Sequence, residues 1–112
     1  MTDRRLLLVA MGGALLAVVM VAERAISAEP ATHTVIMENV RFNPDQLTVK
    51  RGDRVVWVNQ DLFPHTVSAD AKAFDSGDIP VEQSWTYVAA APGRYTYTCA
   101  YHPNMKGTLI VQ

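Results

Sequence analysis

Short runs rich in β-branched and aromatic residues follow one another through most of the chain, and they constrain its fold more than any other feature. Turn-forming residues at 43–45, 51–53, 76–78 and 91–93 separate these runs, and no stretch shows a convincing helical period. Several short strands without helices predict two antiparallel sheets packed face to face, so the expected fold is an all-β sandwich. The expected strands cover residues 34–37, 46–50, 54–58, 84–88, 94–99 and 107–111.

The alternation within 95–99 predicts which side chains face the core. Successive strand residues point to opposite faces, so Tyr95, Tyr97 and Cys99 share one face, and this aromatic face is expected to be buried. Val55 and Trp57 are expected to contribute from an opposing strand. The stretch 69–82 lacks alternation and an EF-hand spacing, so we expect a solvated connection there rather than a calcium site.

The N-terminal segment differs in kind from the rest of the chain. Arg4 and Arg5 precede an uncharged apolar run over 6–22, and Ala25 and Ser27 provide small residues at signal-peptidase spacing. This pattern predicts a hydrophobic signal helix in a signal peptide over 1–28, a mature domain over 29–112 and export to the periplasm. The alternative is an uncleaved anchor that tethers the domain to the membrane, because the run is near the shortest length that spans a bilayer.

Charge and cysteine content narrow the function classes. The formal net charge of −1 gives no electrostatic reason to expect binding to nucleic acid or to an anionic membrane surface. Small exported domains usually supplement a thin core with disulfides or a metal, and a chain with one cysteine cannot form an internal disulfide. A bound metal is therefore the expected stabilising element.

The segment 99–105 carries the candidate metal ligands. Cys99, His102 and Met105 place a thiolate, an imidazole and a thioether three residues apart, and His65 offers a second imidazole. A His₂Cys set with a weak axial Met suits copper and is typical of blue-copper electron-transfer sites. We therefore expect one type 1 copper ion bound by His65, Cys99, His102 and Met105.

Three alternatives compete with this interpretation. A structural zinc site would leave Met105 without a role. A nucleophilic Cys99–His102 pair needs a substrate pocket that nothing in the sequence indicates. Trp57 and the Tyr97-x-Cys99 pattern also occur in immunoglobulin-like sandwiches, but those rely on a second cysteine that is absent here.

The residues of the mature region resemble the amicyanin and plastocyanin branch of the cupredoxins, and the short Cys-x-x-His-Pro-x-Met loop is similar to amicyanin in particular. The resemblance implies an eight-stranded Greek-key sandwich with copper under one end and a partly exposed His102, surrounded by a docking face of Phe63, Pro64, Pro103 and Asn104. Asn is common after the first histidine in these families and Thr66 replaces it here, so the backbone amide is the expected donor to the thiolate. The matching residues are Phe42-x-Pro44-x-x-Leu47-x-Val49-x-x-Gly52-Asp53-x-Val55-x-Trp57-x-Asn59, Phe63-Pro64-His65 and Pro92-Gly93-x-Tyr95-x-Tyr97-x-Cys99-x-x-His102-Pro103-x-Met105-x-Gly107.

The function that follows is one-electron transfer between Cu(I) and Cu(II), carried out by a monomer that is not an enzyme. The resemblance implies redox-protein partners, namely an amine dehydrogenase as donor and a c-type cytochrome as acceptor. The alternative is a copper-binding module for delivery or storage. Such proteins tend to expose several Met or His ligands, and outside the site only His33 and Met37 remain in the mature region, which favours the electron carrier.

Overall fold

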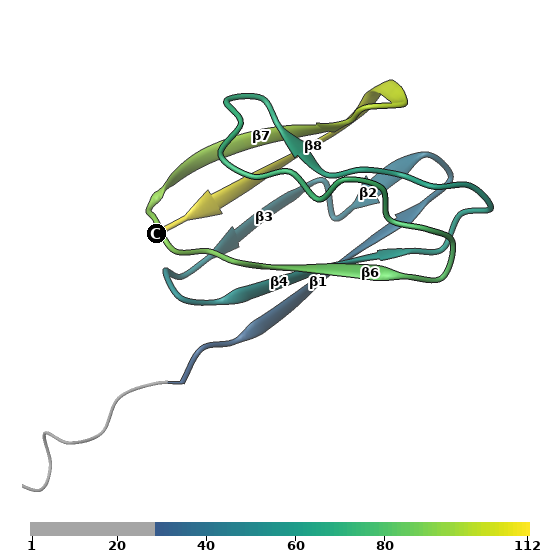
Figure 1. Cartoon of the computed structure of the whole chain (residues 1–112). Coiled ribbons are helices and arrows are strands. Elements are labelled where there is room, and N and C mark those ends of the chain that lie inside the picture. The colour runs from purple at the N-terminus through teal and green to yellow at the C-terminus, as the bar shows by residue number, and fades with distance from the viewer. Residues whose placement is uncertain (1–28) are drawn as a thin grey trace, which may run out of the picture.

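The computed structural model describes residues 29–112, which form two sheets packed face to face (Figure 1). The all-β sandwich expected from the sequence is confirmed. The expected signal peptide and its helix lie outside the described residues. Within 29–112 no helix has the length and apolar character needed to cross a membrane.

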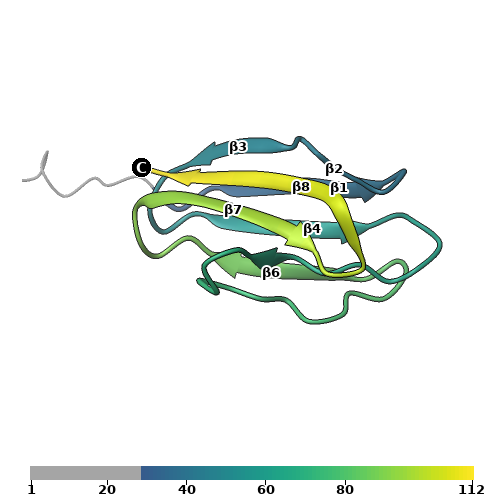
Figure 2. The ribbon, with the colours of Figure 1, turned by 90° about the horizontal axis from the view of Figure 1, so that it is seen from above.

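Each sheet contains four strands, and the two sheets draw their strands from different parts of the chain. One sheet has the order β2-β1-β4-β6, and the other has the order β3-β8-β7-β5. Figure 2 shows that the axes of the long strands of both sheets are roughly aligned. The bounds are β1 Thr32–Glu38, β2 Arg41–Asn43, β3 Gln46–Val49, β4 Arg54–Asn59, β5 Ser68–Ala69, β6 Ser84–Val88, β7 Gly93–Cys99 and β8 His102–Val111.

The pairing within the sheets is mixed rather than purely antiparallel. β1 pairs with β4 in parallel, β3 pairs with β8 in parallel, and the remaining pairs are antiparallel. The expectation of two antiparallel sheets is wrong at these two pairs. The paired strands are not joined by a hairpin, because the chain passes through the opposite sheet between them, so the later strand can run in the same direction as the earlier one. The C-terminus and the β7–β8 connection lie at opposite ends of the sandwich (Figure 1).

The core lies between the sheets and is built from alternate strand positions. Val55 and Trp57 of β4 are fully buried, and Tyr97 and Cys99 of β7 are almost fully buried, as the alternation predicted. Tyr95 is only partly buried, although it packs against the same core. The Trp57 and Tyr97 rings meet edge to face with centroids 5.5 Å apart, a geometry that adds to the stabilisation from burial.

Two segments differ from the sequence expectation. β8 begins at His102, so the segment that carries His102 and Met105 is already part of a strand, and a register shift between Thr98 and Cys99 accommodates it. The stretch 69–82 is not simply solvated, because Phe74 and Ile79 are buried in the core. Ile79 also forms an isolated bridge with His65, which fixes this connection against the end of the sandwich that carries the candidate ligands.

Candidate metal centre

Three of the four expected ligands converge at one end of the sandwich. His65 lies in the connection after β4, Cys99 ends β7 and His102 begins β8. The Cys99 sulfur lies 3.6 Å from His65 Nδ1 and 3.7 Å from His102 Nδ1. All three potential ligand atoms lie within 4.8 Å of one another, which is close enough for a single ion to contact them all.

The fourth expected ligand, Met105, lies on β8 three residues after His102. Its side chain is buried, and the alternate positions Gly107, Leu109 and Val111 of the same strand are buried as well. Met105 therefore belongs to the inward face of β8, the face that continues from the ligand cluster into the core.

Burial differs among the ligand candidates. His65 and Cys99 are inaccessible to solvent, whereas His102 is only half-buried. The ring centroid of Phe63 lies 5.2 Å from that of His65 and 5.5 Å from that of His102, so Phe63 packs on both imidazoles. The four residues of the expected docking face, Phe63, Pro64, Pro103 and Asn104, are all exposed, and Leu62 beside them is 89% exposed.

The Cys99 sulfur receives a hydrogen bond from the backbone. Thr66 N lies 3.3 Å from Cys99 Sγ, as expected for the residue that follows the first histidine. The Thr66 hydroxyl adds a tether that the sequence did not predict, because it accepts a 2.8 Å hydrogen bond from the backbone N of Ala100. Threonine thus connects the two ligand-bearing segments through its side chain.

Asp61 fixes the orientation of the His65 ring. Its Oδ2 lies 2.7 Å from His65 Nε2, and a carboxylate can only accept, so Nε2 carries the proton. In the neutral imidazole this leaves the lone pair on Nδ1, the ring nitrogen that lies 3.6 Å from the Cys99 sulfur. Sequence reasoning missed this residue, and the only available signal was a carboxylate four positions before a candidate ligand histidine.

Asp61 is itself held by backbone donors. Its carboxylate accepts hydrogen bonds from the N–H groups of Asn39 and Val40, at 2.7 and 3.0 Å, in the turn between β1 and β2. Partial burial alone would raise the pKa of the Asp61 carboxyl, but the hydrogen bonds from His65, Val40 and Asn39 outweigh it and lower the pKa. The carboxyl group is therefore ionised and accepts a hydrogen bond from His65 Nε2–H.

The donor set fits copper better than the alternatives. The cluster found among residues 29–112 consists of two imidazoles and one thiol without a carboxylate, next to a buried thioether. These soft and borderline donors are consistent with a type 1 copper site formed by His65, Cys99, His102 and Met105. A four-coordinate zinc site would leave the thioether unused.

Comparison with known proteins identifies relatives among the copper-binding cupredoxins. The Cupredoxin-like domain family matches residues 9–111. The chain is 29% identical over 97 residues to amicyanin-alpha of Methylorubrum extorquens, covering 81% of this chain and 82% of that protein. It is 30% identical over 89 residues to amicyanin of Paracoccus versutus, covering 74% of this chain and 67% of that protein. A plastocyanin of Synechococcus is 34% identical over 86 residues, with 62% of each chain covered.

Solved structures show the same likeness in three dimensions. An oxidized amicyanin variant superposes with a TM-score of 0.68 at 26% identity, over 77% of this chain and 94% of that one. A purple cupredoxin from Nitrosopumilus maritimus superposes with a TM-score of 0.67 at 24% identity, over 71% of this chain and 99% of that one. The second likeness concerns the fold alone.

Proposed function

The chain belongs to the cupredoxin-like family, and on this premise we propose that it is a one-electron carrier that shuttles electrons between periplasmic redox proteins. Cupredoxins are small electron carriers and not enzymes. The observation that supports this function most directly is the convergence of His65, Cys99 and His102, whose donor atoms all lie within 4.8 Å of one another.

We assign His65, Cys99 and His102 as the strong ligands that would hold copper, with Met105 as a weaker fourth ligand. Bound copper would supply the one-electron Cu(I)/Cu(II) couple. Cys99 binds as a thiolate, and the amide of Thr66 stabilises its negative charge with a hydrogen bond. His65 binds through Nδ1 because Asp61 holds the proton on Nε2.

The sandwich keeps these ligands in place when the charge of the site changes. His65 is paired with Ile79 through two backbone hydrogen bonds, of 3.2 and 2.7 Å, and Cys99 ends a strand that pairs along its length with β8. Ligands held in this way rearrange little on oxidation or reduction, which keeps electron transfer fast. His102 is the only half-buried member of the cluster, so a partner that docks over Phe63 would approach the site through it.

Delivery or storage of copper is less well supported by the remaining candidate ligands. Met37 is fully buried in the core, and His33 Nε2 lies 2.9 Å from Asp53. Outside the cluster, therefore, the described part of the chain has no exposed methionine and no free histidine with which to pass copper to another protein. A carrier of electrons needs no such additional ligands.

The proposal extends to the location and the partners. We assign residues 1–28 to a signal peptide or retained anchor, and residues 29–112 to a Greek-key cupredoxin domain that works as a monomer in the periplasm. Two of the relatives are named amicyanins, and by analogy we propose a dehydrogenase as electron donor and a c-type cytochrome as acceptor.

The test is the visible spectrum of the purified protein after addition of Cu(II), followed by a redox titration. We expect an intense blue thiolate-to-copper band that bleaches reversibly with one electron per chain. Cys99→Ala should abolish the band, whereas replacement of the other buried methionine, Met37→Leu, should leave it in place. A band that persists in Cys99→Ala would contradict the ligand assignment.

A further inference from the structure

The two residues that separate Cys99 from His102 are both tied to distant parts of the chain. Ala100 N donates to the Thr66 hydroxyl at 2.8 Å, and the Tyr101 hydroxyl donates to Asp78 Oδ1 at 2.5 Å. The Tyr101 side chain is 53% exposed, so burial alone does not fix its position. Both ties lead toward the segment 75–78, which we call the carboxylate strap.

The first tie continues from Thr66 to the strap through a serine. Ser68 donates its only hydroxyl proton to Asp75 Oδ1, at 3.1 Å. Ser68 must therefore accept in its 3.0 Å contact with Thr66, so the Thr66 hydroxyl is the donor there. Every donor in the series from Ala100 through Thr66 and Ser68 thus points toward the Asp75 carboxylate, and such a series strengthens cooperatively, with the charged acceptor at its end.

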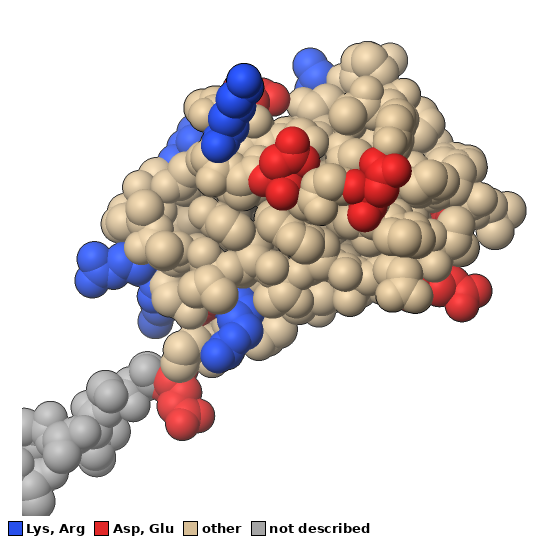
Figure 3. All heavy atoms as spheres, in the orientation of Figure 1, with Lys and Arg blue, Asp and Glu red and all other residues tan. Residues whose placement is uncertain are grey.

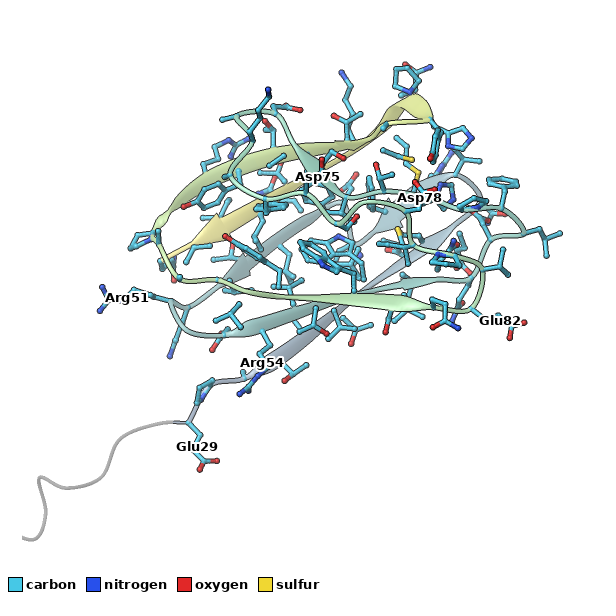
Figure 4. The ribbon with its side chains drawn as sticks, in the orientation of Figure 1. Glu29, Arg51, Arg54, Asp75, Asp78 and Glu82 are labelled. Atoms are coloured by element: carbon cyan, nitrogen blue, oxygen red, sulfur yellow. The ribbon has the colours of Figure 1, made fainter. Side chains whose placement is uncertain are left out.

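The carboxylate strap is itself fixed by hydrogen bonds to the rest of the domain and within its own backbone. Ser76 N donates to the carbonyl of Val67 at 2.9 Å, and the Ser76 hydroxyl accepts from Val67 N at 2.7 Å. Gly77 N donates to Asp75 Oδ1 at 3.0 Å, which orients that carboxylate. Asp75 and Asp78 lie on the same side of the sandwich, on the connection that crosses it (Figure 4), and acidic side chains are visible on this face (Figure 3).

We propose that Asp75 and Asp78 are positioning residues for the metal-binding loop: each carboxylate restrains one of the two residues between Cys99 and His102. Asp75 acts on Ala100 through Ser68 and Thr66, and Asp78 acts directly on Tyr101. This inference rests on the proposed function, because it concerns the loop that would bind copper. Its consequence is that the spacing between the Cys99 thiolate and the half-buried His102 imidazole is set by the strap as well as by the loop.

The first experiment needs no metal. Amide hydrogen exchange of Ala100 is measured by NMR in the metal-free protein and in the Ser68→Ala and Asp75→Ala variants. We expect exchange to be about five-fold faster in each variant, the equivalent of one hydrogen bond of about 1 kcal/mol. The double variant should exchange no faster than the single variants, because both changes break the same series.

The matched control is Asp70→Ala. Asp70 is also an exposed carboxylate that accepts from side-chain hydroxyls, in this case those of Thr96 and Thr98, but it has no hydrogen bond to Ala100 or Tyr101. Exchange of Ala100 should be unchanged in this variant. Unaltered exchange in Ser68→Ala and Asp75→Ala, or an equal increase in Asp70→Ala, would overturn the inference.

The second experiment uses the copper-loaded protein and measures copper release to a chelator. Ser68→Ala and Tyr101→Phe should each accelerate release about five-fold, and the double variant about 25-fold, because the two ties are independent. Ser68→Thr, which keeps the hydroxyl, should restore slow release. If the wild-type protein does not form the blue site, the proposed function fails, while the exchange experiment still decides whether the strap restrains the loop.

Discussion

Replacement of Asp61 perturbs the buried ligand His65 while all four proposed ligand residues stay unchanged. The Asp61 carboxylate accepts three hydrogen bonds, from Asn39 N to Oδ1 and from Val40 N and His65 Nε2 to Oδ2. The amide in Asp61→Asn has only one acceptor oxygen, so it can satisfy Val40 and His65 only by turning its NH₂ group toward the N–H of Asn39. Leucine in Asp61→Leu satisfies none of the three donors.

The expected magnitudes follow from this count. Asp61→Asn loses one hydrogen bond and the charge that strengthens the other two, which should cost about 1–2 kcal/mol of unfolding free energy. Asp61→Leu leaves three donors without an acceptor, one of them on the fully buried His65, and should cost about 3–5 kcal/mol. Loss of the group that selects the His65 tautomer should also weaken copper binding by about 10–100-fold in the leucine variant.

Two measurements test these values. Urea unfolding of the metal-free variants gives the stability loss, and competition with a chelator gives the change in copper affinity. Asp45→Asn is a suitable control, because Asp45 is an exposed carboxylate whose side chain makes no hydrogen bond to His65, whereas the Asp61 carboxylate does. If Asp61→Leu unfolds at the wild-type urea concentration and binds copper with wild-type affinity, Asp61 does not hold His65.

Three further predictions concern other parts of the domain. Gly107→Ala should lower the unfolding free energy by about 2 kcal/mol, because the new Cβ would overlap Cζ and the hydroxyl of the buried Tyr97, and calorimetry should show a Tm about 10 °C lower. A hydrogen bond with His33, together with backbone donors, lowers the pKa of Asp53 to about 2, so its stabilising effect should be complete above its unfolded pKa of 3.8 and be lost as the pH falls toward 2. Urea unfolding between pH 2 and pH 5 checks this, and Asp53→Asn should remove that part of the pH dependence. Met105→Leu should retain copper with an altered midpoint potential in a redox titration, and an unchanged potential would count against axial ligation.

The sequence predicted the strands that are long enough to alternate. β1, β3, β4, β6, β7 and β8 all correspond to expected runs, since each has at least four consecutive residues rich in β-branched or aromatic types and bounded by turn formers. β2 and β5, with three and two residues, are too short to show a period. These short strands form because the longer strands β1 and β7 pair with them. The parallel pairing of β1 with β4 likewise depends on a contact between residues distant in the sequence, which a local pattern does not show.

The sequence also predicted the ligand cluster, because its chemistry is local. Cys99, His102 and Met105 lie within seven residues, and rare donor types at such spacing are informative even before a fold is known. Asp61 could not be recognised in this way. Its role depends on the turn between β1 and β2, about 20 residues earlier in the chain, returning to the end of β4.

The carboxylate strap shows why the loop sequence alone does not determine the loop geometry. Asp75 and Asp78 are exposed, and in a sequence they look like ordinary solvated charges. In the fold, Thr66 reaches Ala100 across 34 positions and Asp78 reaches Tyr101 across 23. A hydrogen bond between residues so distant forms only after the sandwich has closed. The two residues that set the separation of Cys99 from His102 are therefore restrained by tertiary structure, and the same seven-residue loop in a sandwich without the strap would lack both restraints.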